Sequence, residues 1–481
     1  MKSFCYILSK LGTTIATFVV SIVLARVLCI KEYATFLQIF LIVQILSNVL
    51  SFGLPRSIYF FSVKYNQSIE YLTMNMLSLI GLVSCLLILL FIDNIAHFVN
   101  NQELSNYSIY LAILLGTRIV NQSFQPIMIN LSKTNQASII LTIYSVLIIV
   151  NVTTWSILDL PLSYLLSGYC TIEFLLILVI YYEFFQVQKI KMPIVELAIL
   201  KSQLIYCYPL AIAIITSLLY KRMDQIIVSH FFSPAQFAIY SRGAIDLPII
   251  PIIVYSMMGL ISPKLVGFFS EQKFEAFAQL VKNTFRQCSY FTISSTIFFL
   301  LFHKELIVLL FGESFEASAP IFAIYLFSVP LQTLSYDAIL QCIGDTRSIL
   351  LISLFGMFSN LIVSLMLLPY LQLYGPVIAT IGSLAIMFLL YIVLISRRLN
   401  KSILSIVPFK EIFHIFVISL IAAIPCIFWK GFSTFSSPIN LCAAGISFGL
   451  VFLFLFAILP TVDPVDRKLA HNLLSSIKRP Q

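Results

Sequence analysis

The fold is decided by residues 206–264, which read YCYPLAIAIITSLLYKRMDQIIVSHFFSPAQFAIYSRGAIDLPIIPIIVYSMMGLISPK. Two long apolar runs meet here at a short break, and they carry the charged residues Lys221, Arg222, Asp224, Arg242 and Asp246. A charge at the centre of a membrane helix costs roughly 2.5–3.5 kcal/mol, so such side chains persist where they face water or one another. We therefore expect the rest of the chain to form the walls of a hydrated cavity.

The composition excludes a water-soluble protein. Of the 481 residues, 60% are hydrophobic and 10% are charged, and the mean hydropathy is +1.01. Soluble proteins carry about 25% charged residues. The apolar runs are continuous, as in membrane helices, and do not alternate as in barrel strands. The sequence therefore predicts an all-α polytopic membrane protein.

Apolar runs of about the length that crosses a bilayer recur along the whole chain. They predict about fourteen transmembrane helices, at Cys5–Leu28, Thr35–Leu54, Thr73–Ile92, Tyr107–Ile129, Ala137–Ile157, Leu162–Phe184, Tyr206–Val228, Phe237–Ile261, Gln287–Phe302, Ala319–Ile343, Ser348–Leu368, Val377–Ile395, Ile412–Phe428 and Ile439–Leu459.

The distribution of lysine and arginine predicts the orientation. With the N-terminus in the cytoplasm, 21 of the 29 basic residues fall in inner segments and 4 in outer segments. This bias follows the positive-inside rule and favours an even number of spans, with both termini cytoplasmic. The net charge of +9 then reflects inner loops that meet anionic headgroups, so we expect membrane lipids, and no nucleic acid, as partners.

The sequence contains no pattern typical of an enzyme or of a bound cofactor. The connecting loops are too short for a soluble catalytic domain, and no Walker-type loop is present. Nine cysteines are scattered without a C-x-x-C pair, and five histidines are dispersed, which argues against metal sites and disulfides. Nothing in the residues suggests ATP hydrolysis, and we expect no cofactor or metal, with a coupling proton or Na⁺ ion as the one candidate small ligand.

The chain resembles a known family in several loose motifs that occur in order. They are Ala25-Arg26-Val27-Leu28, Lys31-Glu32-Tyr33, Phe52-Gly53-Leu54-Pro55-Arg56, Met223-Asp224-Gln225-Ile226-Ile227, Phe237-Ala238-Ile239-Tyr240 and Phe311-Gly312-Glu313-Ser314-Phe315. In this order and spacing they are similar to the Wzx-type O-antigen and capsule flippases of the multidrug/oligosaccharidyl-lipid/polysaccharide (MOP) superfamily. One departure is Cys29-Ile30, where the family more often has glycine.

The resemblance implies a fold like that of MATE transporters, with two six-helix bundles around a central cavity and two additional C-terminal helices. We place an N-terminal lobe at 1–185, a cytoplasmic linker at 186–205, a C-terminal lobe at 206–398, two additional helices at 399–460 and a cytoplasmic tail at 461–481. The resemblance also implies the cargo, an oligosaccharide repeat unit on undecaprenyl diphosphate that crosses the bacterial cytoplasmic (inner) membrane. A polysaccharide polymerase and a chain-length regulator are candidate partners.

Arginines distributed across the membrane are the candidate substrate-binding residues. A diphosphate headgroup needs cations in place of its water, and the planar arginine fork grips phosphate oxygens in pairs. At about 1.5 Å per residue, Arg118 falls near mid-membrane, too deep to reach the headgroups easily. The other candidates are Arg26, Arg56, Arg222 and Arg242. For these four, anchoring to headgroups or pairing with a neighbour is the competing interpretation.

Four carboxylates are expected at membrane depth: Glu173, Asp224, Asp246 and Asp337. Each can bind a coupling proton or sodium ion, or can balance the charge of an arginine. We favour charge balance for Asp224 and Asp246. Pro248 and Pro251 beside Asp246, and Pro330 near Asp337, are expected to bend their helices.

Two alternatives to a flippase stay open from the sequence alone. A MATE-type drug/cation antiporter would need an acidic or neutral cavity, which the excess of cations disfavours. A membrane-embedded polysaccharide polymerase or glycosyltransferase usually carries a long outer loop, which this chain lacks outside 303–318. A lipid II flippase is a further possibility within the flippase hypothesis.

Overall fold

The computed structural model describes residues 2–65, 68–187, 197–431 and 437–458. Their contacts divide the chain into two compact units, Met1–Ala238 (unit 1) and Ile239–Gln481 (unit 2). The predicted tail, 461–481, and residues 188–196 of the predicted linker lie outside the described residues. All regular secondary structure in the described ranges is helical.

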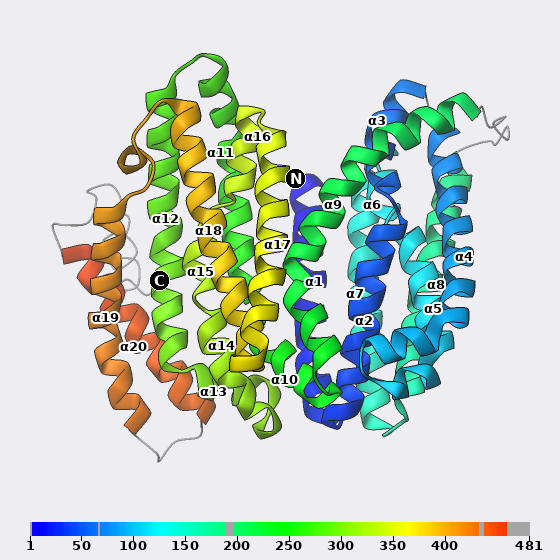
Figure 1. The fold of residues 1–481 in the computed structure, drawn as a ribbon, viewed down its shortest axis with the longest axis horizontal. Coiled ribbons are helices and arrows are strands. Elements are labelled where there is room, and N and C mark those ends of the chain that lie inside the picture. The colour runs from blue at the N-terminus through cyan, green and yellow to red at the C-terminus, as the bar shows by residue number, and fades with distance from the viewer. Residues whose placement is uncertain (1, 66–67, 188–196, 432–436, 459–481) are drawn as a thin grey trace, which may run out of the picture. The chain divides into compact units, whose positions relative to one another are not determined.

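Unit 1 is a bundle in which helices distant in sequence pack together (Figure 1). The strongest pairings are α1 with α7, α4 with α5, and α5 with α8. Its helices are α1 (Lys2–Val27), α2 (Ile30–Leu50), α3 (Leu54–Tyr65), α4 (Ser68–Phe98), η1 (Gln102–Tyr107), α5 (Ser108–Asn121), α6 (Phe124–Asn130), α7 (Thr134–Ile157), α8 (Leu162–Val187), α9 (Leu197–Phe231) and the first part of α10 (Pro234–Gly243).

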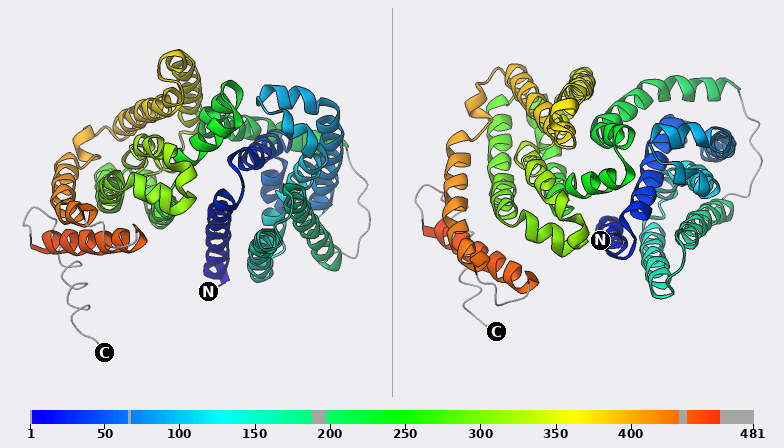
Figure 2. Two further views of the ribbon diagram at one scale, coloured as in Figure 1. Left: turned by 90° about the horizontal axis from the view of Figure 1, so that it is seen from below. Right: turned by 60° about the horizontal axis from the view of Figure 1, so that its bottom comes forward.

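Unit 2 contains the remaining helices. Its closest pair is α17 with α18, and α19 packs against both α12 and α20 (Figure 2). The helices are α11 (Ile249–Ser270), α12 (Phe274–Leu301), α13 (His303–Phe311), η2 (Glu313–Ser318), α14 (Ala319–Tyr325), α15 (Ser328–Leu331), α16 (Tyr336–Ile343), α17 (Thr346–Leu371), α18 (Tyr374–Leu399), η3 (Ile403–Ser405), α19 (Phe409–Gly431) and α20 (Ser437–Ile458).

The all-α membrane fold predicted from the sequence is confirmed. Twelve helical segments of the described chain are long and apolar enough to cross a membrane, and α12 with α13, bent by 82°, gives a thirteenth. The predicted span 107–129 is also helical, but it is divided into α5 and α6. The division follows from Pro126, which has no N–H to donate to the carbonyl of Gln122.

Two more predicted spans are interrupted where the sequence places proline. The run 237–261 is broken between α10 and α11, and Asp246 and Pro248 lie in this break. The run 319–343 is divided into α14, α15 and α16, and Pro330 lies in α15. In both cases the helix ends and restarts near a predicted carboxylate, Asp246 in the first and Asp337 in the second.

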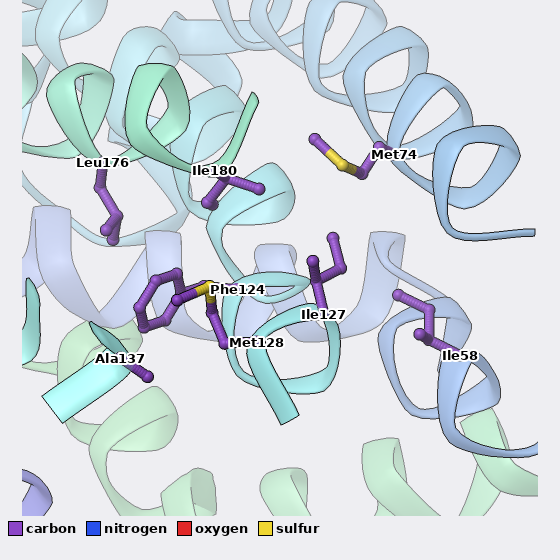
Figure 3. Packing of buried hydrophobic residues seen from close by; sticks show 8 residues of the cluster. All are labelled: Ile58, Met74, Phe124, Ile127, Met128, Ala137, Leu176 and Ile180. Carbon is purple, nitrogen blue, oxygen red and sulfur yellow. The ribbon is translucent and has the colours of Figure 1, made fainter. Parts of the chain in front are cut away.

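The inner core of unit 1 is an apolar cluster of side chains from five helices (Figure 3). Phe124, Ile127 and Met128 of α6 contribute its centre, and Ile58 of α3 and Met74 of α4 border it. Burial of such side chains contributes about 25 cal/mol per Å² of apolar surface. The short helices α3 and α6 are therefore fixed to the bundle by packing.

Helix α9 is joined to the rest of unit 1 at both of its ends. Near its start, the Gln203 amide donates to Ser57 Oγ of α3 and Thr73 Oγ1 of α4, each at 2.8 Å. Near its end, Ser229 Oγ accepts a hydrogen bond of 3.0 Å from Gln38 Nε2 of α2. By contact α9 thus belongs to unit 1, whereas the sequence analysis begins a C-terminal lobe at residue 206. That lobe boundary stays a prediction.

Several ion pairs hold one end of unit 2 together. Arg398 at the end of α18 contacts Asp345, the residue before α17, with Nη2–Oδ2 at 2.6 Å and Nε–Oδ2 at 2.8 Å. Lys401 contacts Glu275 at the start of α12. Basic residues at the ends of these helices, which the positive-inside pattern predicts to be on the inner side, are thus paired with carboxylates.

Candidate functional site

The candidate site lies in unit 1, where α5, α7 and α8 bring four polar side chains together. Arg118 and Asn121 are three residues apart on α5 and so share one helix face. Tyr144 comes from α7 and Glu173 from α8. Each of the four stands in a predominantly apolar helix, and their polar atoms bond to one another.

Glu173 is the centre of the hydrogen-bond network. Its Oε1 lies 2.7 Å from Arg118 Nη1 and accepts a bond of 2.8 Å from the Tyr144 hydroxyl. Its Oε2 accepts from Asn121 Nδ2, which also donates to the Glu173 backbone carbonyl at 3.0 Å. Three side chains, one of them a cation, thus converge on this buried carboxyl.

The two charged partners differ in exposure. The Glu173 side chain is 6% exposed and the Arg118 side chain is 49% exposed. Arg118 Nη1 also donates to the Tyr144 oxygen at 3.4 Å. In the described part of the chain both bonds use Nη1. The one N–H of Nε and the two of Nη2 therefore remain available as hydrogen-bond donors.

The Arg118 guanidinium is therefore bonded to the bundle through Nη1, which we call its held side, while its Nε–Nη2 edge, the open side, is left for a ligand. Glu173, Tyr144 and Asn121 fix the held side from within the bundle. The open Nε–Nη2 edge has the geometry that binds two oxygens of a phosphate or carboxylate. An anionic headgroup could bind there without displacing Glu173.

The other predicted residues of unit 1 are separate from this network. Arg26 and Arg56 are exposed, in the last turn of α1 and the first turn of α3. Arg222 of α9 donates to Gln225 at 3.4 Å. Asp224 is 5% exposed, and its Oδ1 accepts from the backbone N–H of Gln225 at 2.8 Å.

In unit 2 the predicted residues gather around the interrupted helices. Arg242 is 9% exposed, and its guanidinium lies over the ring of Phe311, 5.4 Å from the centroid. Asp246 is exposed in the break after α10 and accepts from the Tyr325 hydroxyl at 3.2 Å. Asp337 is exposed in the first turn of α16. No three His, Cys, Asp or Glu side chains of the described ranges come together as metal ligands.

Sequence reasoning found Arg118 and Glu173 but missed their two neutral partners. Asn121 could have been found, because a position three residues after a membrane-depth arginine shares its helix face. Tyr144 gave no such signal. The chain has 23 tyrosines, and only the packing of α7 on α8 selects this one.

Comparison with known proteins agrees with these observations. A family model described as polysaccharide biosynthesis protein matches residues 1–266. A search of curated proteins finds no match.

Solved structures with the same fold include three transporters. The lipid II flippase MurJ in an inward closed conformation has a TM-score of 0.75 and 15% identity, with 94% of this chain and 98% of that chain covered. An inward-facing MATE multidrug resistance transporter of the MOP superfamily has a TM-score of 0.65 and 17% identity, with 81% of this chain and 96% of that chain covered. A MOP superfamily transporter from Pyrococcus furiosus has a TM-score of 0.53 and 16% identity, with 83% of this chain and 95% of that chain covered. The resemblance stated from the sequence motifs is confirmed at the level of family and fold.

Proposed function

Since the chain belongs to the polysaccharide biosynthesis protein family, we propose that it is a flippase for lipid-linked oligosaccharides. It moves a repeat unit of O-antigen, capsule or a related surface polysaccharide, carried on undecaprenyl diphosphate, from the inner to the outer leaflet. The membrane is the bacterial cytoplasmic membrane, with both termini cytoplasmic. The MurJ fold supports the proposal, because the protein of that name flips another lipid-linked molecule.

The observation that carries the proposal is the half-exposed Arg118, held on one edge by buried Glu173. The cargo's diphosphate must leave water to cross about 30 Å of hydrocarbon. Arg118 offers it a fixed cation with three free donors at mid-membrane depth. Arg26, Arg56, Arg222 and Arg242 are proposed as further cationic contacts along the route, and Asp224, Asp246 and Asp337 as their charge balance or as coupling-ion sites.

The test uses a strain in which this protein is the sole exporter of its glycan. Arg118→Ala should abolish surface polysaccharide and cause lipid-linked units to accumulate in the inner leaflet, while the tagged protein stays in the membrane. Arg118→Lys is the matched control. It keeps the charge but not the fork, and it should restore only part of export. Normal surface polysaccharide with Arg118→Ala would contradict the proposal.

The MATE fold makes a drug/cation antiporter the second candidate. Expression in a drug-sensitive strain separates the two candidates. The flippase proposal predicts no change in resistance to cationic drugs. Resistance that is lost with Asp246→Asn or Asp337→Asn, with export unaffected by Arg118→Ala, would favour the antiporter.

A further inference from the structure

Besides Glu173 and Asp224, unit 1 contains a buried carboxyl that the proposed flippase site does not use. Glu70 lies in the first turn of α4 and is 1% exposed. The apolar run that predicts the third span begins at Thr73, so the sequence predicts Glu70 in a loop. In the structure α4 starts at Ser68 and packs on α3, which buries Glu70 inside the bundle.

The surroundings of Glu70 are apolar or neutral. Met74, one turn further along α4, and Ile58 of α3 belong to the apolar cluster of unit 1 (Figure 3). The polar side chains that act on the carboxyl are Ser62 of α3 and Asn130 of α6, and neither carries a charge. Glu70 Oε2 and Ser62 Oγ are buried without a hydrogen-bond partner in the described chain.

The described residues place no cation on Glu70. On the neighbouring helices, Arg56 and Tyr59 of α3 and Lys201 of α9 are turned outward, and α6 carries no titratable side chain. Arg118 of α5 is bonded to Glu173, and Lys133 before α7 to Glu183 at 2.5 Å. Other titratable side chains on these helices are Tyr71, Cys85, Asp93 and His97 of α4, Glu103 and Tyr107 of η1, and Tyr110 of α5. Those of α9 are Tyr206, Cys207 and Tyr208 in its first half and Tyr220, Lys221, Arg222, Asp224 and His230 in its second half. Tyr181 of α8 bonds Ser78. The side chain of Lys64 lies outside the described part.

We propose that Glu70 is a proton-binding site. A carboxylate buried among apolar groups without a cation is unfavourable, and the first-turn position on α4 favours the charge by a smaller amount. A bound proton makes the carboxyl neutral and so removes the cost of burying its charge. The carboxyl is neutral while the α3–α4–α6 seam is closed, and the proton passes to water when the seam opens.

The site is placed to act on α9. Gln203 of α9 bonds both Ser57 of α3 and Thr73 of α4, and Thr73 is one helical turn from Glu70. Loss of the proton would therefore create a charge in the seam that holds the start of α9. If the proposed flippase function is correct, on which this last step rests, Glu70 carries the coupling proton.

Carbodiimide labelling tests the protonation directly, because carbodiimides react with protonated carboxylic acids in apolar surroundings. The full chain is reconstituted in vesicles of phosphatidylethanolamine and phosphatidylglycerol, treated with dicyclohexylcarbodiimide across a pH series, and mapped by peptide mass spectrometry. We expect labelling of Glu70 at neutral pH that declines as the pH rises, with Glu173 and Glu183 unlabelled as matched ion-paired controls. Labelling of Glu173 in preference to Glu70 would overturn the proposal.

Infrared spectroscopy decides the matter if the reagent cannot reach the seam. The carbonyl band of a protonated carboxylic acid should be present in the wild type and lost in Glu70→Gln. Its presence in both variants, or in neither, would overturn the proposal. Lys64→Gln should leave the band unchanged, and a band that appears only in Lys64→Gln would show that a lysine had kept Glu70 ionised.

Neither measurement depends on transport, so failure of the flippase proposal is detected separately. In vesicles that flip a lipid-linked oligosaccharide, Glu70→Gln should remove the dependence of the flipping rate on a pH gradient. An unchanged dependence would refute the coupling role. Absence of flipping by the wild type would refute the function and leave the proton site standing.

Discussion

Glu173 and Glu70 are both buried carboxyls of unit 1, with 5% and 1% of the residue surface exposed, but their neighbouring side chains differ in charge. Glu173 accepts from Arg118, Tyr144 and Asn121, whereas the described polar side chains that act on Glu70 are the neutral Ser62 and Asn130. The presence of a cation decides what a buried carboxyl can do. The paired one holds an arginine for an anionic ligand, and the unpaired one is suited to bind a proton.

The largest effect is expected for Arg118→Ala, which leaves Glu173 buried without its cation. Breaking such a pair costs about 3 kcal/mol, the lower part of the usual range, because the arginine is half-exposed. The unfolding temperature in detergent should fall markedly, and flipping should be lost. An unchanged unfolding temperature would mean that the pair does not hold α5 to α8.

Glu173→Gln should cost less, about 1–2 kcal/mol, because Arg118 can turn its charge to water while the amide keeps part of the network. The comparison of the two variants by thermal unfolding tests the asymmetry in exposure. If Glu173→Gln were the more destabilising change, the arginine would be the buried partner and the open-fork description would be wrong.

Tyr144→Phe removes one hydrogen bond from Glu173 without removing a charge. We expect a loss of about 1 kcal/mol and a reduced, not abolished, flipping rate. Tyr164, exposed near the start of α8, offers a matched control in Tyr164→Phe, which should change neither quantity. Equal effects of the two substitutions would remove Tyr144 from the site.

Asp345 sharpens the comparison as a carboxylate paired outside the spans. Burial acts to raise its pKa, but bonds from Ser348 and Arg398 outweigh this and hold the pKa below its ordinary value of 3.8. A lowered pKa stabilises the fold above the ordinary value, and the contribution is lost as the pH falls through the folded pKa. Asp345→Asn keeps the cap of α17 and should cost about 0.5 kcal/mol at neutral pH. Between pH 5 and 8 the cost should be constant. It should begin to shrink near pH 4 and disappear once the pH is below the folded pKa.

Glu70→Gln should have the smallest effect on stability, within about 0.5 kcal/mol of the wild type, because an amide resembles the neutral acid. Glu70→Lys is the contrasting variant, since it buries a charge of the other sign in the same place. It should destabilise the protein severely. A large loss with Glu70→Gln would show that the carboxyl is charged in the folded state.

The sequence predicted the class of fold because apolar content and span length are local properties. It identified Arg118 and Glu173 for the same reason, since both stand alone in apolar runs. It could not pair them, because the two residues are 55 positions apart in the chain and only the packing of α5 on α8 joins them. It missed Glu70 because the helix starts five residues before the apolar run, and Tyr144 because tyrosine is common in this chain.

The most direct test of the central claim is flipping of a fluorescent undecaprenyl-diphosphate oligosaccharide in vesicles that contain the purified full chain. Reduction of the outer-leaflet fluorophore by dithionite reports the rate. We predict rapid exchange with the wild type and none above empty vesicles with Arg118→Ala, at equal amounts of folded protein. Equal rates for the two proteins would contradict the role of the Arg118 fork in carrying the headgroup.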